Sequence, residues 1–248
     1  MPIKIWILTH FPIAYDSLKE MGVIGKVLRE GNEFELRPVL ISQYCKKGFK
    51  GLDASPYGGG DGMVLRADAL KEALLKGVVE VGEYGENWRE KLHVVFPGPR
   101  GSQWSNLLAK ELACKIIERQ KDLVFICGRY EGVDERFLRN YIDQEISIGD
   151  YVLSGGDIAV MTIIDSTLRF FPGVLGNQSS SVDESFENNL LEHSQYTRPE
   201  VFEGEKVPEV LLSGNHQKIK AFREKEKLEV TKSRRPDLIS KCYKENLK

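Results

Sequence analysis

The fold class is indicated most clearly by one stretch, Gly149-Asp150-Tyr151-Val152-Leu153-Ser154-Gly155-Gly156-Asp157. The apolar run before it, Ile142 to Ile148, is typical of a buried strand, and Ile158 to Phe170 after it has apolar residues at helical spacing. Glycine at the carboxyl end of a strand lets the backbone approach a ligand closely. The stretch therefore predicts an α/β domain with a ligand site at this edge of its sheet.

The same alternation extends toward the N-terminus. Further apolar runs that predict strands are Ile3 to Thr9, Phe34 to Ile41, His93 to Phe96 and Leu123 to Cys127. Between the runs 93–96 and 123–127, Leu107 to Arg119 has the spacing of an amphipathic helix. Strands that alternate with helices predict a mostly parallel sheet covered on both faces.

Composition places the chain among ordinary globular proteins. Its 248 residues hold 35 Lys+Arg and 37 Asp+Glu, with 41% hydrophobic and 29% charged residues, which argues against disordered and collagenous classes. The four cysteines form no C-x-x-C pair, so neither a zinc site nor a disulfide framework is indicated. No apolar stretch approaches the roughly 20 residues of a membrane span. We expect a cytoplasmic protein with no membrane partner.

Charge and composition change toward the C-terminus. The stretch 176–185 is polar and serine-rich, which predicts an exposed linker. Residues 216–248 hold eleven Lys and Arg against five Asp and Glu, whereas the rest of the chain is net negative. His216 to Leu228 has helical spacing. The sequence predicts a domain boundary near the linker and a basic, mainly helical tail.

Three more glycine clusters accompany the first stretch. They are Pro56-Tyr57-Gly58-Gly59-Gly60-Asp61-Gly62-Met63, Pro97-Gly98-Pro99-Arg100-Gly101 and Gly128-Arg129-Tyr130-Glu131-Gly132. Any one of them alone is typical of a turn. Three clusters at strand ends together predict a pocket lined by backbone. The dinucleotide, P-loop, G-x-S-x-G and H-E-x-x-H motifs are all missing, which removes the commonest nucleotide-binding and hydrolase arguments.

Six longer motifs follow one another along the chain. They are Asp53-x-x-Pro56-Tyr57-Gly58-Gly59-Gly60-x-Gly62-Met63, Gly128 to Arg136, Ser147 to Gly156, Arg169-Phe170-x-Pro172-Gly173-Val174-Leu175-Gly176, Tyr196 to Val201 and Val210 to His216. Together they resemble the TrmD family of bacterial tRNA (guanine-N1)-methyltransferases, in the SPOUT superfamily. The match covers nearly the whole chain.

The resemblance implies a fold, an activity and an assembly. It implies a deep trefoil-knotted α/β domain with a parallel sheet that binds S-adenosylmethionine over residues 1–174, a flexible linker over 175–189 and a small helical tRNA-binding domain over 190–248. The expected product is N1-methylguanosine at position 37 of tRNA, next to the anticodon. The expected enzyme is a homodimer with its active site between the subunits.

The resemblance also assigns residues to the cofactor. These are Phe96, Pro97, Gly98, Gly128, Tyr130, Glu131, Gly132, Ser147, Ile148, Gly149, Asp150, Tyr151, Val152, Leu153, Gly155 and Gly156. Ile148 and Leu153 suit contact with an adenine face. Phe96 fits the pocket and ordinary strand core equally well. The cluster 97–101 departs from the family, whose members usually have Leu-Ser-Pro-Gln-Gly there.

Methyl transfer to guanine N1 requires loss of the N1 proton and stabilisation of negative charge toward O6. Arg169 aligns with the family's catalytic arginine, although helix-dipole compensation alone would explain a cation there. The family's base is an Asp directly before Ser-Phe. Here Glu184 has that position and Asp183 precedes it, so Glu184 is the favoured base and Asp183 the alternative. Both acids would otherwise only solvate the loop.

Several residues are candidates for the remaining contacts. Substrate-binding candidates are Gly59, Arg198, Lys220 and Arg223, and further phosphate contacts are expected from Lys227, Arg234 and Arg235. Such cations are otherwise typical of a solvated helix face. Tyr196 and Phe202 would stack on a base or pack the tail. The resemblance implies Mg²⁺, for which Glu131 is the candidate ligand.

Two other functions stay open at this level. A related methyltransferase could act on another RNA, against which the tail motifs argue. A catalytically silent RNA-binding protein is the second, because the order Asp183-Glu184 departs from the family's pattern at the base.

Overall fold

The computed structural model describes residues 2–45, 51–129, 131–175 and 184–239. The chain divides into two compact units, Met1–Gly176 and Asn177–Lys248. Two predicted site residues, Tyr130 and Asp183, lie outside the described residues. The boundary between the units falls inside the linker expected at 175–189.

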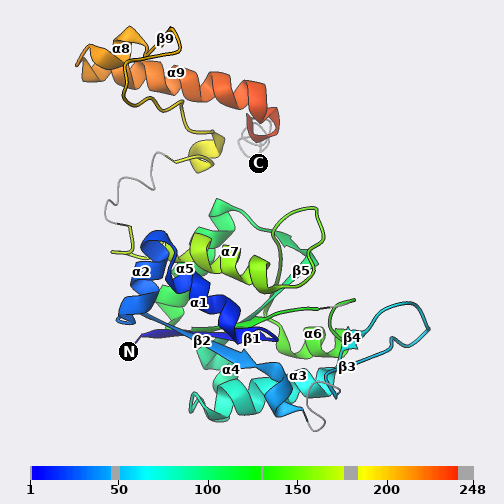
Figure 1. Cartoon of the computed structure of the whole chain (residues 1–248). Coiled ribbons are helices and arrows are strands. Elements are labelled where there is room, and N and C mark those ends of the chain that lie inside the picture. Colours follow the sequence, from blue (N-terminus) through cyan, green and yellow to red (C-terminus); the bar gives the residue numbers. More distant parts are fainter. Residues whose placement is uncertain (1, 46–50, 130, 176–183, 240–248) are drawn as a thin grey trace, which may run out of the picture. The chain divides into compact units, whose positions relative to one another are not determined.

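The first unit is built on one five-stranded sheet (Figure 1). All of its pairings are parallel, and the strand order is β2-β1-β6-β5-β7. The strands are β1 (Ile3–Thr9), β2 (Phe34–Leu40), β5 (Leu92–Gln103), β6 (Asp122–Ile126) and β7 (Gln144–Ser147). The α/β class and the parallel sheet predicted from the sequence are confirmed.

Helices cover both faces of this sheet (Figure 1). One face carries α1 (Asp16–Lys19), α2 (Gly22–Glu30), α5 (Asn106–Arg119) and α7 (Asp157–Leu168), and the other carries α3 (Ala67–Leu74), α4 (Trp88–Lys91) and α6 (Glu135–Tyr141). Strand β1 shows why two layers form, because successive side chains point to opposite faces. Ile5 and Ile7 pack in one core cluster, whereas Trp6 and Leu8 pack in the other.

Strand β5 is longer than the sequence predicts. A strand over His93 to Phe96 and a loop over 97–101 were expected, but β5 continues to Gln103. Pro97 and Ser102 both pair with Ile146, so the residues between them form a bulge. A Cβ atom at Gly101 would lie 2.3 Å from the Ile146 nitrogen, so glycine is what lets the strand return to its partner.

Shorter elements complete the first unit. They are the helical turns η1 (Pro12–Tyr15) and η2 (Ile41–Tyr44), the π-helical segment η4 (Leu75–Glu80) and the antiparallel pair β3 (Asp53–Ala54) and β4 (Val64–Leu65). The predicted glycine cluster 56–63 forms the loop that joins β3 to β4. We call β3, β4 and this loop the β3–β4 arm.

The second unit is dominated by one helix, α9 (His216–Arg234), which runs six residues beyond its predicted end at Leu228. The Asn215 side chain caps its start by accepting a hydrogen bond from the Lys218 nitrogen. The other elements are η5 (Glu187–Asn189), the hairpin β8 (Val201–Phe202) and β9 (Glu205–Lys206), and α8 (Glu209–Leu212). Over the ranges that the structure describes, no helix has the length and apolar character of a membrane span.

A half-buried histidine near the start of β5 makes the fold sensitive to acid. Burial lowers the pKa of His93, and it outweighs the hydrogen bond with Gln144 and the charge of Asp143, which raise it. The unfolded chain therefore binds more protons than the folded chain below about pH 6.5. The unfolding free energy decreases as the pH is lowered through that range.

We expect His93→Gln to weaken this pH dependence. The wild type should lose up to about 1 kcal/mol of unfolding free energy through His93 between pH 6.5 and 5.5, and the variant should be spared that part of the loss. Urea unfolding at several pH values measures it. His216→Gln, which removes an exposed imidazole, is the control. An identical slope in the wild type and His93→Gln would contradict the prediction.

Candidate functional site

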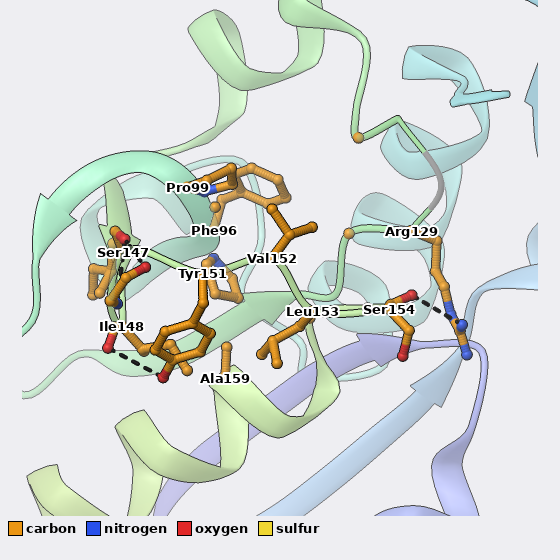
Figure 2. A pocket seen from close by; sticks show the side chains of 18 of the residues that line it. Phe96, Pro99, Arg129, Ser147, Ile148, Tyr151, Val152, Leu153, Ser154 and Ala159 are labelled. Carbon is orange, nitrogen blue, oxygen red and sulfur yellow. Dashed lines mark hydrogen bonds between the residues drawn. The ribbon is translucent and has the colours of Figure 1, made fainter. Parts of the chain in front are cut away.

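A hollow of about 270 Å³ lies at the carboxyl ends of β5, β6 and β7 (Figure 2). Its size is near the lower end of small-molecule sites, roughly 300 Å³. The residues that line it are Phe96, Pro97, Gly98, Pro99, Gly128, Arg129, Glu131, Gly132, Ile146, Ser147, Ile148, Gly149, Tyr151, Val152, Leu153, Ser154, Gly155, Gly156 and Ala159. The prediction that three glycine clusters converge on one pocket is confirmed. We call this hollow the loop pocket.

Two hydrogen bonds join the loop after β6 to the loop after β7. The Gly156 nitrogen donates to the Gly128 carbonyl oxygen at 2.9 Å, and the Arg129 guanidinium donates to the Ser154 carbonyl oxygen at 3.3 Å. A Cβ atom at Gly156 would lie 2.9 Å from the Gly128 nitrogen. Glycine is therefore required where the loop after β7 crosses the end of β6.

The pocket combines apolar side chains with backbone polar groups. Figure 2 shows Ile148, Tyr151 and Leu153 near Ala159 of α7. The Tyr151 hydroxyl donates to the Ile148 carbonyl oxygen at 3.4 Å. Phe96 is 6% exposed, and it both packs in the core and lines the pocket. It is therefore at once a strand-core residue and a pocket residue. Such a lining suits a flat apolar group with a polar edge.

A half-buried carboxylate ties the pocket to the first strand. Asp157 begins α7 directly after Gly156, and its Oδ1 accepts from the Thr9 hydroxyl at 2.5 Å and from the Tyr15 hydroxyl at 3.1 Å. Thr9 and Tyr15 are fully buried. Burial and the neighbouring Cys127 and Asp157 raise the pKa of Tyr15, so its hydroxyl stays protonated and keeps donating. This cluster joins β1, η1 and the loop after β7.

A basic group flanks the same loops. The Arg129 guanidinium lies 4.3 Å from the centre of the Phe11 ring, which is a cation–π distance. Burial lowers the pKa of His10, and the charge of Arg129 acts in the same direction. His10 is therefore neutral at pH 7, and Arg129 is the cation at this edge of the pocket.

The pocket includes most, though not all, of the predicted cofactor residues. Asp150 does not line it and is exposed, because the loop directs its neighbours Gly149 and Tyr151 inward instead. Sequence reasoning missed Pro99, Arg129, Ile146, Ser154 and Ala159. Arg129 and Ser154 lie inside quoted glycine motifs, which was a usable signal. Ile146 and Ala159 reach the pocket only through tertiary packing.

Arg169 lies away from the loop pocket of its own chain. It is the C-cap residue of α7, whose first residue is Asp157. A helix of 12 residues is ~18 Å long, and Arg169 is not among the pocket's lining residues. The predicted catalytic arginine and the pocket are therefore at opposite ends of one helix.

Glu131 lies between the loop pocket and a second hollow. The second hollow, of about 960 Å³, separates the β3–β4 arm from α6 and is also lined by Glu131. Two of its cations are paired, Arg66 with Asp68 at 2.6 Å and Arg136 with Asp134 at 2.7 Å. The predicted substrate residue Gly59 is on the arm, with a positive φ of 81°.

The described residues do not support the predicted Mg²⁺ ligand. Within the described ranges, no three or more His, Cys, Asp or Glu side chains come together in a way that could hold a metal ion. Glu131 instead packs on the arm, where a Cβ atom at Gly62 would lie 2.5 Å from its Cγ.

In the second unit, the predicted RNA contacts differ in exposure. Arg198, Lys220 and Arg223 are exposed, as are Tyr196 and Phe202 at 46% and 66%. Lys227 differs from the prediction, since its side chain is only 11% exposed and its Nζ lies 3.1 Å from Glu224 Oε1. Lys227 turns toward the interior because Thr231, one turn further along α9, is buried on the same side.

Comparison with known proteins assigns the chain to a family. The family model described as tRNA (Guanine-1)-methyltransferase TrmD matches residues 3–241. The chain belongs to this family. TrmD relatives named tRNA (guanine-N(1)-)-methyltransferase include one from Clostridium beijerinckii, 45% identical over 99% of this chain and 97% of the relative. Others are from Clostridium perfringens, 44% identical over 99% and 98%, and Desulfatibacillum aliphaticivorans, 42% identical over 94% and 84%.

Membership in the TrmD family makes the chain a methyltransferase that acts on guanine N1 of tRNA. The resemblance stated from six sequence motifs is confirmed.

We expect Asp157→Ala to destabilise the fold, because Asp157 hydrogen-bonds the start of α7 to β1 and η1. The substitution leaves the buried Thr9 and Tyr15 hydroxyls without their acceptor, which should lower the unfolding free energy by at least about 2 kcal/mol. Urea unfolding measures it. Asp165→Ala, at an exposed site on the same helix, is the control and should change stability by less than about 0.5 kcal/mol. Equal effects of the two variants would show that the buried cluster contributes nothing.

Proposed function

We propose that this enzyme transfers a methyl group from S-adenosylmethionine to N1 of guanosine 37 in tRNA. The observation that carries the proposal is the convergence of three glycine-rich loops on one pocket in a chain of the TrmD family. A backbone-lined hollow with apolar walls fits a nucleoside group, and it opens at the carboxyl ends of parallel strands, where ligands of such sheets bind.

The loop pocket is the proposed donor site. Ile148 and Leu153 would contact the adenine faces, and backbone groups near Gly149 and Gly156 would meet its edge. The bound donor supplies a methyl group on a positively charged sulfonium. The residues around it contribute by orientation, which can be worth roughly 7 to 11 kcal/mol of barrier.

A homodimer is proposed because one chain does not bring its parts together. Arg169 is ~15 Å along α7 from Ala159 of the loop pocket, so its guanidinium would stabilise charge at guanine O6 in a site completed by a second chain. Apolar side chains are exposed near the start of α7, with Ile158 at 60% and Ile13 at 79%. A dimer contact would cover such groups.

Glu184 is the proposed general base. It is half-buried at the start of the described part of the second unit, directly before Ser185 and Phe186. Its carboxylate would accept the N1 proton as the methyl group transfers, an effect typically worth 10² to 10⁴ in rate. Asp183 precedes it outside the described residues and stays the alternative.

The tRNA contacts are proposed on both units. In the first unit, the β3–β4 arm with Gly59 borders the hollow that shares Glu131 with the loop pocket. In the second unit, Arg198 and the α9 residues Lys220 and Arg223 offer exposed cations for phosphates. The tail unit, residues 190–248 in the sequence prediction, is thus the proposed RNA-binding domain.

The trefoil knot is also proposed from the family resemblance. The wholly parallel order in which β5 lies between β6 and β7 is compatible with it. No step is assigned to Mg²⁺, because the described residues form no suitable group of ligands.

We expect Glu184→Gln to slow methyl transfer at least tenfold, because an amide cannot accept the N1 proton. Single-turnover transfer to tRNA with guanosine at 37 measures the rate, and nucleoside mapping gives the methylated position. Donor affinity by calorimetry should stay within about twofold, since the proposed role of Glu184 is to accept the guanine proton and not to hold the donor. Exposed Glu205→Gln is the control, and Asp183→Asn tests the other acid.

The outcomes of that assay separate the open questions. If neither acid variant slows transfer, the base assignment is wrong. Methylation of a guanosine other than 37 would change the proposed target, and donor binding without any transfer by the wild type would indicate a silent member of the family.

We expect tRNA affinity to fall steeply with salt, because phosphate contacts release counterions. Lys220→Gln and Arg223→Gln should each weaken binding and lower the slope of log affinity against log salt by up to about 1. Filter binding at several salt concentrations measures both. Lys225→Gln, on the same helix at a cation already 3.7 Å from Glu229, is the control. A flat salt dependence would contradict this role for α9.

A further inference from the structure

The segment that carries the proposed base is a closed loop, although it contains little regular structure. The Phe186 nitrogen donates to the Leu190 carbonyl oxygen at 2.6 Å. The Glu192 nitrogen donates to the Ser185 hydroxyl at 3.0 Å. The second bond closes the loop at the residue next to Glu184. Any element that holds this loop therefore also fixes the position of the Glu184 backbone.

Helix α9 holds the loop at three points. Arg235, just after the helix, has its guanidinium 6.0 Å from the centre of the Phe186 ring. Thr231 Oγ1 accepts from the Leu191 nitrogen at 2.9 Å, and Glu226 Oε2 accepts from the Ser194 nitrogen at 3.2 Å. The loop thus runs antiparallel to the helix, along roughly 14 Å of it.

Thr231 is the central and most buried of these contacts. Its side chain is fully buried, and its hydroxyl donates to the Lys227 carbonyl oxygen at 2.6 Å. A helical threonine often makes only this bond to its own helix. Here the same oxygen also accepts from Leu191, so both the donor and the acceptor capacity of the hydroxyl are used inside the protein.

The same helix carries the proposed phosphate contacts. Lys220 and Arg223 are exposed on α9, two to three turns before Thr231. A helix is stiff over this length, so a helix docked on phosphates places Thr231, and Thr231 places the loop. A displacement of about 1 Å at a reacting group can cost 10²-fold in rate.

We propose that Thr231 is a positioning residue for methyl transfer, which connects the docking of α9 on tRNA to the placement of Glu184 through the Leu191 amide. This inference rests on the proposed function, in which α9 binds tRNA and Glu184 is the base. It assigns to the tail unit a role in the chemical step as well as in binding.

The test compares two substitutions at one position. Thr231→Val keeps the shape of the side chain but removes the hydroxyl, and Thr231→Ser keeps the hydroxyl. We expect Thr231→Val to lower the single-turnover rate at saturating tRNA at least about tenfold, with tRNA and donor affinities within about twofold of wild type. Thr231→Ser should restore the rate to within about threefold.

A double variant separates positioning from general damage to the fold. If Thr231 acts through Glu184, Thr231→Val should add little further loss in a Glu184→Gln background, because the two effects are not independent. A full additional loss in that background would overturn the inference and leave the base assignment standing. A Glu184→Gln enzyme as fast as wild type would instead overturn the proposed function on which the inference rests.

Two further results would also count against the inference. One is an unchanged rate in Thr231→Val, and the other is a rate loss that disappears at saturating tRNA, which would make Thr231 a binding residue only. If circular dichroism shows that Thr231→Val has lost helix, Glu226→Ala decides by the same criteria. That variant removes the acceptor of the Ser194 amide at an accessible site on α9.

Discussion

Close approach of backbone to backbone is the constraint on which the loop pocket depends. At Gly156 a single added carbon would meet the end of β6, and at Gly101 it would meet the backbone of β7. These two contacts bring loops from three strands within reach of one ligand. Asp157 and the buried hydroxyls of Thr9 and Tyr15 then join the same region to β1, so the pocket is continuous with the core.

The chemistry is distributed over parts of the chain that lie far apart in the sequence. The loop pocket belongs to the first unit, whereas Glu184 and the exposed cations of α9 belong to the second. Arg169 is at the far end of α7 from the pocket. We propose that a second chain and the tRNA itself bring the donor, the base and the cation to one guanine. The network around Thr231 matters because it links the acid to the helix proposed to meet that tRNA.

Sequence reasoning succeeded where a local pattern carried the signal. Strands β1 and β6 are mostly apolar, and β2 carries apolar residues among charged ones. Strand β1 was therefore predicted with its observed ends, and β2 and β6 to within about a residue. It failed where neighbours decide the outcome. The glycine cluster after Phe96 has the composition of a loop, yet pairing with Ile146 keeps it in β5. Helices α2, α3 and α6 are short, and such segments depend on tertiary packing more than on their own pattern.

The sequence by itself determined the α/β class, the parallel sheet, the glycine clusters at strand ends and, through six motifs, the family. These are properties of local pattern and residue type, which a one-dimensional string records. Only the tertiary structure decided that Asp150 turns away from the pocket while Ile146 and Ala159 line it, and that Lys227 is buried against Glu224. The physical reason is that the direction and burial of a side chain depend on which segments pack around it. The residue type at one position does not record which distant segments those are.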